Sequence, residues 1–137
     1  MSANVFLDTN ILVYVYSETE PEKQRIARIL VLEDISHIST QVLQEFSNTL
    51  NKKFKKSWPE IAEAVREVAK GSFVNVNNEA TIQQAIKIAE KYKFSFYDSL
   101  IITAALECKC STLYSEDMNH VQLIESQLTI VNPFGFS

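Results

Sequence analysis

Four acidic side chains, placed at the ends or flanks of predicted elements, could together bind a cation: Asp8, Glu45, Asp98 and Asp117. Asp98 is the most informative, because the helix predicted around it is apolar nearly all round. At about 100° per residue, three apolar side chains lie within roughly 60° of it on the helical wheel: Ile101, Ile102 and Ala105. An ionised carboxylate on a core-facing stripe is costly unless a cation or several donors meet it. Together the four carboxylates predict a buried cation site.

Each of the other three carboxylates also has a simpler explanation when it is considered alone. Asp8 could cap the helix that follows it, since Asp is favoured at that position. Glu45 lies at the edge of the apolar stripe of its helix, where a solvated side chain is the simpler interpretation. Asp117 could stabilise a turn through its own side chain, and Glu116 is most simply an exposed neighbour.

The chemistry of these side chains favours a hard divalent cation. Carboxylates that converge in a low-dielectric cleft cannot all stay ionised without compensating charge. Mg²⁺ and Mn²⁺ prefer oxygen ligands and supply that charge. The two histidines, His37 and His120, have no metal-ligand spacing with a cysteine, which argues against zinc and against a histidine general base. A water activated by the metal is then the natural nucleophile.

Length and composition indicate one ordered, helix-rich domain spanning residues 1–137. The chain is 46% hydrophobic, with only 2 Gly and 3 Pro, and contains no repeat or linker. The N-terminal residues lack the pattern of a signal peptide, and no apolar run approaches the roughly 18 residues of a membrane span. Cys108 and Cys110 are too few for a disulfide framework and are expected to be reduced thiols near a helix–strand junction. These features predict a cytoplasmic protein that does not span a membrane.

The charge pattern contains one basic run in an acidic chain. The net charge of −4 does not favour binding to a polyanion. The basic run consists of Lys52, Lys53, Lys55 and Lys56. A solvated helix end, where the helix dipole favours cations, and a phosphate-binding role explain this run equally well.

Short apolar strands alternate with amphipathic helices along the chain. The predicted strands are Ala3–Leu7, Ile35–Ile38, Phe73–Val76, Ser111–Tyr114 and Leu128–Val131. The predicted helices are Thr9–Tyr16, Pro21–Glu33, one capped by Ser39 or Thr40 that runs to about Phe54, one opened by Ser57 that runs to about Lys70, Glu79–Tyr92 and Phe96–Leu106. This order implies an α/β fold with a mostly parallel central sheet of about 4–5 short strands, flanked by helices on both faces. Ligands of such sheets bind beyond the carboxyl ends of the strands, which is where the acidic residues are expected.

The sequence resembles the PIN-domain ribonucleases, in particular the VapC-type toxins of toxin–antitoxin pairs. The resemblance extends from Val5 to about Phe134, and its specific parts are Phe6–Tyr14, Gln44–Phe46, Phe96–Ile102, Leu113–Asp117 and Ile130–Phe134. Each part is a weak match alone, but their order and spacing are specific. The resemblance implies a single PIN-like nuclease domain in which Asp8, Glu45, Asp98 and Asp117 form the metal-binding catalytic quartet. It also implies that Thr9, Asn10 and Ser115 support this quartet through hydrogen bonds.

The residues and the resemblance together predict a Mg²⁺- or Mn²⁺-dependent endoribonuclease that cuts single-stranded or looped RNA. One ion would lower the pKa of a water, and a second would stabilise the leaving 3′-oxygen, so that 5′-phosphate and 3′-hydroxyl ends remain. Backbone contacts could come from the run that contains Lys52, Lys53, Lys55 and Lys56. The resemblance further implies a cognate antitoxin partner and a homodimer.

Several alternatives stay open at the level of the sequence. The chain could be a free-standing PIN-like nuclease that acts on other RNA or on DNA, or a non-catalytic acidic binding module of the same fold. A receiver-like phospho-acceptor domain is weakly supported, because Val131–Pro133 stands where its lysine should follow the last strand. An aspartyl-phosphate phosphatase would need a second Asp at position 10, which is Asn10.

Overall fold

The computed structural model describes residues 4–33 and 35–135, which form six strands and six helices around one sheet. The strands are β1 (Asn4–Leu7), β2 (Ile35–Ser39), β3 (Phe73–Asn75), β4 (Thr112–Tyr114), β5 (Gln122–Ile124) and β6 (Leu128–Val131). The helices are α1 (Thr9–Val15), α2 (Pro21–Glu33), α3 (Thr40–Lys52), α4 (Trp58–Lys70), α5 (Glu79–Tyr92) and α6 (Phe96–Glu107). The predicted helices and strands are confirmed to within one or two residues at their ends, where hydrogen bonding frays. Ala3, the start of the first predicted strand, lies outside the described residues.

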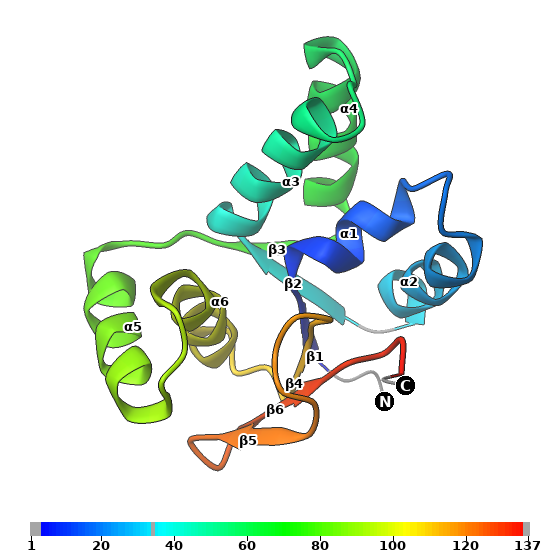
Figure 1. The fold of residues 1–137 in the computed structure, drawn as a ribbon. Coiled ribbons are helices and arrows are strands. Elements are labelled where there is room, and N and C mark those ends of the chain that lie inside the picture. Colours follow the sequence, from blue (N-terminus) through cyan, green and yellow to red (C-terminus); the bar gives the residue numbers. More distant parts are fainter. Residues whose placement is uncertain (1–3, 34, 136–137) are drawn as a thin grey trace.

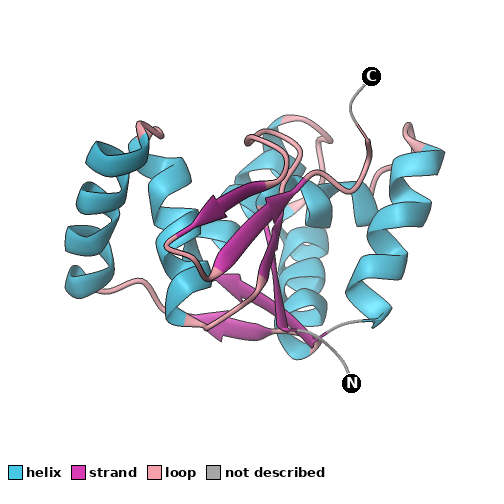
Figure 2. Ribbon diagram, turned by 90° about the horizontal axis from the view of Figure 1, so that it is seen from below, coloured by secondary structure: helices cyan, strands magenta, loops and turns pink. Residues whose placement is uncertain are grey.

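The sheet has the strand order β3-β2-β1-β4-β6-β5, and every neighbouring pair is parallel except β5 with β6. Helices α5 and α6 cover one face, and α1 to α4 cover the other (Figure 1). A view from below shows the twisted sheet enclosed between these helices (Figure 2). The prediction of a mostly parallel sheet flanked on both faces is therefore confirmed. Among the described residues, no helix combines the length and the apolar character that crossing a bilayer requires.

The sheet contains one strand more than the sequence predicts, and the additional strand is β5. This strand has only three residues, and it joins β6 through a turn in which Glu125 and Ser126 both have positive φ angles, of 51° and 54°. Gly and Asn are the usual residues in such a turn, and neither occurs here, so the common hairpin signal is missing. The backbone N–H of Gln127 closes the turn on the carbonyl of Ile124 at 3.0 Å.

The core explains why the helices hold fixed positions on the sheet. Helix α6 is buried over the continuous run 99–105, as expected for a helix that is apolar nearly all round. In α3, the buried Val42, Phe46 and Leu50 repeat at helical spacing and leave the neighbouring face free for polar side chains. The cysteines lie at the predicted junction, where Cys108 caps α6 and Cys110 precedes β4, and both are free thiols.

The chain order reverses direction between β1 and β4, the two central strands of the sheet. From β1 the chain crosses to β2 and β3 on one side, and from β3 it returns to β4 on the other side. The backbone N–H of Asp8 donates to the carbonyl of Tyr114 at 3.0 Å and so joins the residue that follows β1 to the last residue of β4. In open α/β sheets, ligands bind in the crevice at such a reversal.

Candidate functional site

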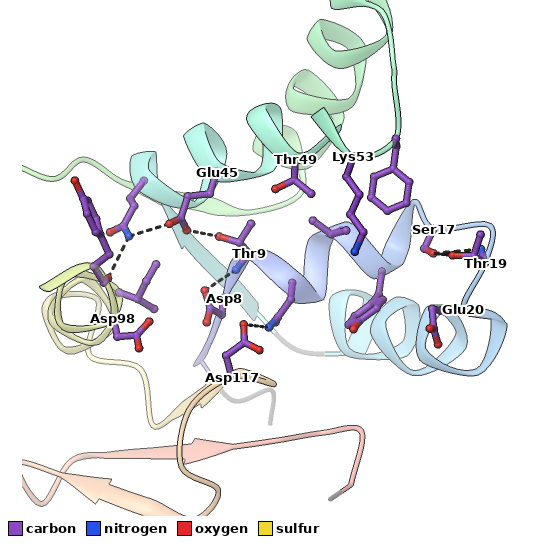
Figure 3. A pocket seen from close by; sticks show the side chains of 17 residues that line it. Asp8, Thr9, Ser17, Thr19, Glu20, Glu45, Thr49, Lys53, Asp98 and Asp117 are labelled. Carbon is purple, nitrogen blue, oxygen red and sulfur yellow. Dashed lines mark hydrogen bonds between the residues drawn. The ribbon is translucent and has the colours of Figure 1, made fainter. Parts of the chain in front are cut away.

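A pocket of about 400 Å³ lies at the reversal point between β1 and β4. The segments that line it are α1 and the loop 17–20 after it, one face and the C-terminal end of α3, the first two turns of α6 and the loop after β4 (Figure 3). All four acidic residues predicted from the sequence line this pocket: Asp8, Glu45, Asp98 and Asp117. The structure therefore brings them together; their assignment as catalytic metal ligands stays a prediction.

Asp8 is both a helix cap and a pocket residue. Its Oδ1 accepts a hydrogen bond from the backbone N–H of Thr9 at 2.7 Å, and its Oδ2 accepts one from the Ser115 hydroxyl at 2.7 Å. Only 8% of the residue is exposed. The pKa of Asp8 is raised from 3.8 to about 6, chiefly by burial; the two hydrogen bonds lower the pKa, and the negative charges of Glu45 and Asp98 raise it. The capping explanation and the site explanation are thus compatible.

Asp98 lies at the end of the apolar stripe and not inside it. The apolar neighbours predicted for it are buried, but Asp98 itself is half-buried and opens into the pocket (Figure 3). It belongs to the first turn of α6, where its backbone N–H donates to the Ser95 hydroxyl at 3.1 Å. Burial raises its pKa, the hydrogen bond with Ser95 lowers it, and the charges of Asp117 and Glu45 raise it. The rigid helix thus presents a charged group whose surroundings disfavour charge.

Glu45 is held by hydrogen bonds in the pocket and is not a solvated flank. The Thr9 hydroxyl donates to its Oε1 at 2.6 Å, and Gln41 Nε2 lies 3.5 Å from its Oε2. The same Gln41 amide donates to the backbone carbonyl of Tyr97 at 3.2 Å, which ties α3 to α6. Gln41 is not among the site residues that the sequence predicts. Its position one helical turn before Glu45, on the same face of α3, is the signal that could have identified it.

Asp117 is the most open of the four acids. Its Oδ2 accepts a hydrogen bond from Asn10 Nδ2 at 3.0 Å, and its backbone N–H lies 3.3 Å from the Ser115 hydroxyl. Ser115 therefore contacts both Asp8 and the backbone of Asp117. Each of the predicted supporting residues, Thr9, Asn10 and Ser115, contacts at least one of the four acids.

Glu116 points to other partners and lies outside the set of described residues that line the pocket. Its carboxylate pairs with Lys23 and accepts a hydrogen bond from the Tyr14 hydroxyl at 2.5 Å. The expectation that it is an exposed neighbour is wrong, because these contacts leave it half-buried.

The structure separates the four lysines of the basic run. Lys53 is the only Lys or Arg among the described residues that line the acidic pocket, and it reaches down from the end of α3 (Figure 3). Its Nζ lies 5.7 Å from the centroid of the Phe54 ring. Lys56 lines a separate pocket of about 180 Å³ beside α4, and Lys52 and Lys55 are exposed outside both pockets.

The side chains of the pocket suit a hard cation in their chemistry. The candidate metal-ligand atoms of the four acids are carboxylate oxygens. None of the four acids forms an ion pair with a described residue. Two oxygens from pocket residues, Asn10 Oδ1 and Gln41 Oε1, are buried and have no hydrogen-bond partner within the described part of the chain. As the side chains stand, no three described Asp, Glu, His or Cys residues are spaced as ligands of one ion. The carboxylates would have to move closer together to share a cation.

The sequence of the chain matches the PIN domain family over residues 5–124. The chain belongs to the PIN domain family. The expected PIN-like fold is thereby confirmed. Among curated protein sequences, none matches this PIN domain.

Solved structures with a similar fold include toxins and toxin–antitoxin complexes. A toxin–antitoxin complex from Klebsiella pneumoniae aligns with a TM-score of 0.70 and 18% identity, over 94% of this chain and 97% of that chain. VapC20 of Mycobacterium tuberculosis, described as a toxin that cleaves the sarcin-ricin loop, has a TM-score of 0.65 and 16% identity, over 82% and 89% of the two chains. The VapBC2 complex of Rickettsia felis, bound to promoter DNA, has a TM-score of 0.60 and 18% identity, over 83% and 88%. At these identities the likeness concerns the fold of the PIN domain alone.

Proposed function

We propose that this PIN domain is a Mg²⁺- or Mn²⁺-dependent endoribonuclease that cuts single-stranded or looped RNA, with residues 1–137 acting as one nuclease domain. The observation that carries the proposal is the convergence of four carboxylates, from four separate segments, on one pocket at the reversal point of the sheet. None of them is neutralised by a described basic side chain. The similar fold of a toxin that cleaves the sarcin-ricin loop supports RNA as the substrate class.

The residues that would hold the metal are Asp8, Glu45, Asp98 and Asp117. When bound, the ion would neutralise charge at the phosphate and lower the pKa of a water that attacks phosphorus. Hydrolysis with departure of the 3′-oxygen would leave 5′-phosphate and 3′-hydroxyl ends.

Neutral side chains of the pocket orient these acids for that task. Ser115 and the Thr9 backbone fix both oxygens of Asp8, while the Thr9 hydroxyl and Gln41 fix Glu45. A hydrogen bond to a neutral donor restricts the rotation of a carboxylate and leaves its negative charge available to a cation. These hydrogen bonds would limit the rotation of Asp8 and Glu45 as the carboxylates close on an ion.

Lys53 is the candidate contact to the RNA backbone, because it lines the same pocket as the acids. A lysine that neutralises a phosphate stabilises binding by releasing counterions. Contacts by Lys52, Lys55 and Lys56 are a weaker part of the proposal, since these side chains lie outside the described lining of the pocket.

The test is a cleavage assay on mixed RNA with the purified protein. We expect cleavage with Mg²⁺ or Mn²⁺, none with EDTA, and none for Asp8→Asn or Asp98→Asn, with folding verified by circular dichroism. Undiminished cleavage by both variants would refute the assignment. Cleavage of DNA in preference to RNA would instead support a free-standing nuclease, and metal-dependent binding without cleavage would support a non-catalytic module.

We further propose that the protein is the toxin of a toxin–antitoxin pair and acts as a homodimer. The similar folds found in toxin–antitoxin complexes support an antitoxin partner. Co-expression with the product of a small adjacent reading frame should yield a stable complex in which cleavage is inhibited. The mass of the free protein, measured by light scattering, tests the dimer.

A further inference from the structure

Glu116 uses both of its carboxylate oxygens in contacts with two side chains: Lys23, which lies outside the described lining of the acidic pocket, and Tyr14, which is part of that lining. Lys23 Nζ pairs with Oε2, and the Tyr14 hydroxyl donates to Oε1 at 2.5 Å. Lys23 also donates to the Tyr14 hydroxyl at 3.2 Å, so the three polar groups contact one another in a closed triangle. Both oxygens are thus committed, and the Glu116 side chain has a fixed orientation.

Two aromatic rings cover the lysine of this triangle. Lys23 Nζ lies 4.9 Å from the centroid of the Tyr14 ring and 5.7 Å from that of Phe134. The two rings meet edge to face, with centroids 5.0 Å apart. An ammonium held against ring faces and partly shielded from water pairs more firmly than an exposed surface lysine. We call Tyr14, Lys23, Glu116 and Phe134 the Glu116 cluster; it joins α1, α2, the loop after β4 and the segment after β6.

The position of Glu116 in the chain connects this cluster to the acidic pocket. It lies between Ser115, whose hydroxyl contacts Asp8, and Asp117, which accepts from Asn10. Each residue of the segment 115–117 is therefore anchored by a different partner. Asp117 itself is exposed, so its position depends more than that of Asp8 on the anchoring of its neighbours.

We propose that Lys23 and Glu116, with Tyr14 and Phe134, are positioning residues that hold Asp117 and Ser115 at the metal site. This inference rests on the proposed function, because it presumes that the pocket binds a divalent ion. The ion pair lies outside the pocket lining and so acts through the backbone of 115–117, without touching the ion.

The chain contains a second cluster of nearly the same composition that serves as a control. Lys91 Nζ lies 2.6 Å from Glu125 Oε2, the Tyr92 hydroxyl donates to the same oxygen at 2.7 Å, and Lys91 Nζ lies 5.3 Å from the Tyr92 ring centroid. This Glu125 cluster joins α5 to the turn between β5 and β6 and lies outside the described lining of the acidic pocket. Breaking it removes the same kinds of contact at a site that bears no candidate metal ligand.

The experiment is a Mn²⁺ titration of the full chain, followed by the electron paramagnetic resonance signal of free Mn²⁺. We expect Glu116→Gln and Lys23→Gln each to weaken Mn²⁺ binding by about 10-fold, the lower end of the loss typical for residues behind metal ligands. Lys23→Arg should retain most of the affinity, because it preserves the ion pair. Glu125→Gln and Lys91→Gln should bind Mn²⁺ as the wild type does, even where thermal unfolding without metal shows a similar loss of stability.

Three outcomes would overturn the inference. Wild-type affinity in both Glu116→Gln and Lys23→Gln would show that the cluster does not position the site, while the proposed function would stand. An equal loss in Glu125→Gln would show that general stability, and not position, sets the affinity. A wild-type protein that binds no Mn²⁺ would overturn both the inference and the proposed function.

Discussion

The acids of the pocket and Glu125, at the turn between β5 and β6, contact different kinds of partner. At the turn between β5 and β6, Glu125 contacts a lysine, Lys91, and its charge is neutralised within the chain. In the pocket, the neighbours of Asp8 and Glu45 are hydroxyls, amides and other acids. Neutral donors fix the direction of a carboxylate but leave its charge uncompensated. Under the proposed function, a bound divalent ion would compensate the charge of the pocket acids, as Lys91 compensates that of Glu125.

The pKa values of Asp8 and Glu125 are shifted in opposite directions. Burial raises the pKa of Asp8 to about 6, whereas the hydrogen bonds with Lys91 and Tyr92 lower the pKa of Glu125. The folded protein thus disfavours the charge of Asp8 and favours that of Glu125. Functional sites commonly retain such local costs, since a site optimised for stability alone would not keep a buried, unneutralised carboxylate.

The largest expected effect is on the rate of RNA cleavage, which should depend on the pocket acids and not on Glu125. Glu45→Gln and Asp117→Asn should each reduce RNA cleavage by more than the roughly 10–100-fold typical of residues that only support metal ligands. Glu125→Gln should cleave RNA at the wild-type rate. The measurement is the initial rate of cleavage of a labelled RNA at saturating Mn²⁺. Wild-type rates in both pocket variants would remove the distinction between the two groups.

The second effect is a difference in how stability depends on pH. Because the folded pKa of Asp8 lies above its ordinary value of 3.8, the native state binds this proton more tightly than the unfolded state does. The contribution of Asp8 to the free energy of unfolding should therefore fall as the pH rises from 3.8 to about 6, by roughly 3 kcal/mol. Glu125 acts in the opposite sense: its lowered pKa gives stability above its ordinary value, and that stability is lost as the pH falls.

Urea unfolding at pH 4 and pH 7 in EDTA tests this contrast. The change in the free energy of unfolding caused by Asp8→Asn should be more favourable at pH 7 than at pH 4. The change caused by Glu125→Gln should be less favourable at pH 7 than at pH 4. The same pH dependence in both variants would show that the two acids do not differ in the way their surroundings indicate.

The convergence of the acids was predictable because it follows from topology. Asp8 and Asp117 follow strands that a parallel α/β order brings to the same sheet edge, and Asp98 stood out against an apolar helix. The strand β5 was not predictable from turn residues, because Glu125 and Ser126 adopt positive φ angles without Gly or Asn. Single residues at the ends of elements are therefore easier to place than short antiparallel strands.

Partners that lie far apart in the sequence were the least predictable part of the site. Lys23 and Glu116 belong to α2 and to the loop after β4, and neither segment carries a pattern that specifies the other. In the same way, composition alone could not distinguish Lys53 from the other lysines of its run. Lys53 differs from the other lysines because it lies four residues after Thr49 with its backbone still in the αR region, on the same face of α3 as Glu45.

Metal binding should also distinguish the two groups through stability. A ligand at 100 times its Kd stabilises the folded state by about 2.7 kcal/mol, which corresponds to several degrees in Tm for a chain of this size. We expect Mn²⁺ to raise the Tm of the wild type and of Glu125→Gln, and EDTA to reverse the change. Asp98→Asn should lose this response because a ligand is missing. An unchanged Mn²⁺ response in Asp98→Asn would place the ion outside the acidic pocket.

The smallest expected effect concerns Lys53, the one lysine among the described residues that line the acidic pocket. Lys53 lines the acidic pocket, whereas Lys55, two residues later, is exposed and lies outside its described lining. In the cleavage-deficient Asp98→Asn background, Lys53→Gln should weaken binding of a single-stranded RNA and lower the slope of log K against log salt by about 0.7, the value for one phosphate contact. Lys55→Gln should leave the slope unchanged. Only a lysine that contacts a phosphate should change the number of counterions released. Equal slopes in both variants would therefore mean that the lysine run acts through its total charge and not through a contact made by Lys53.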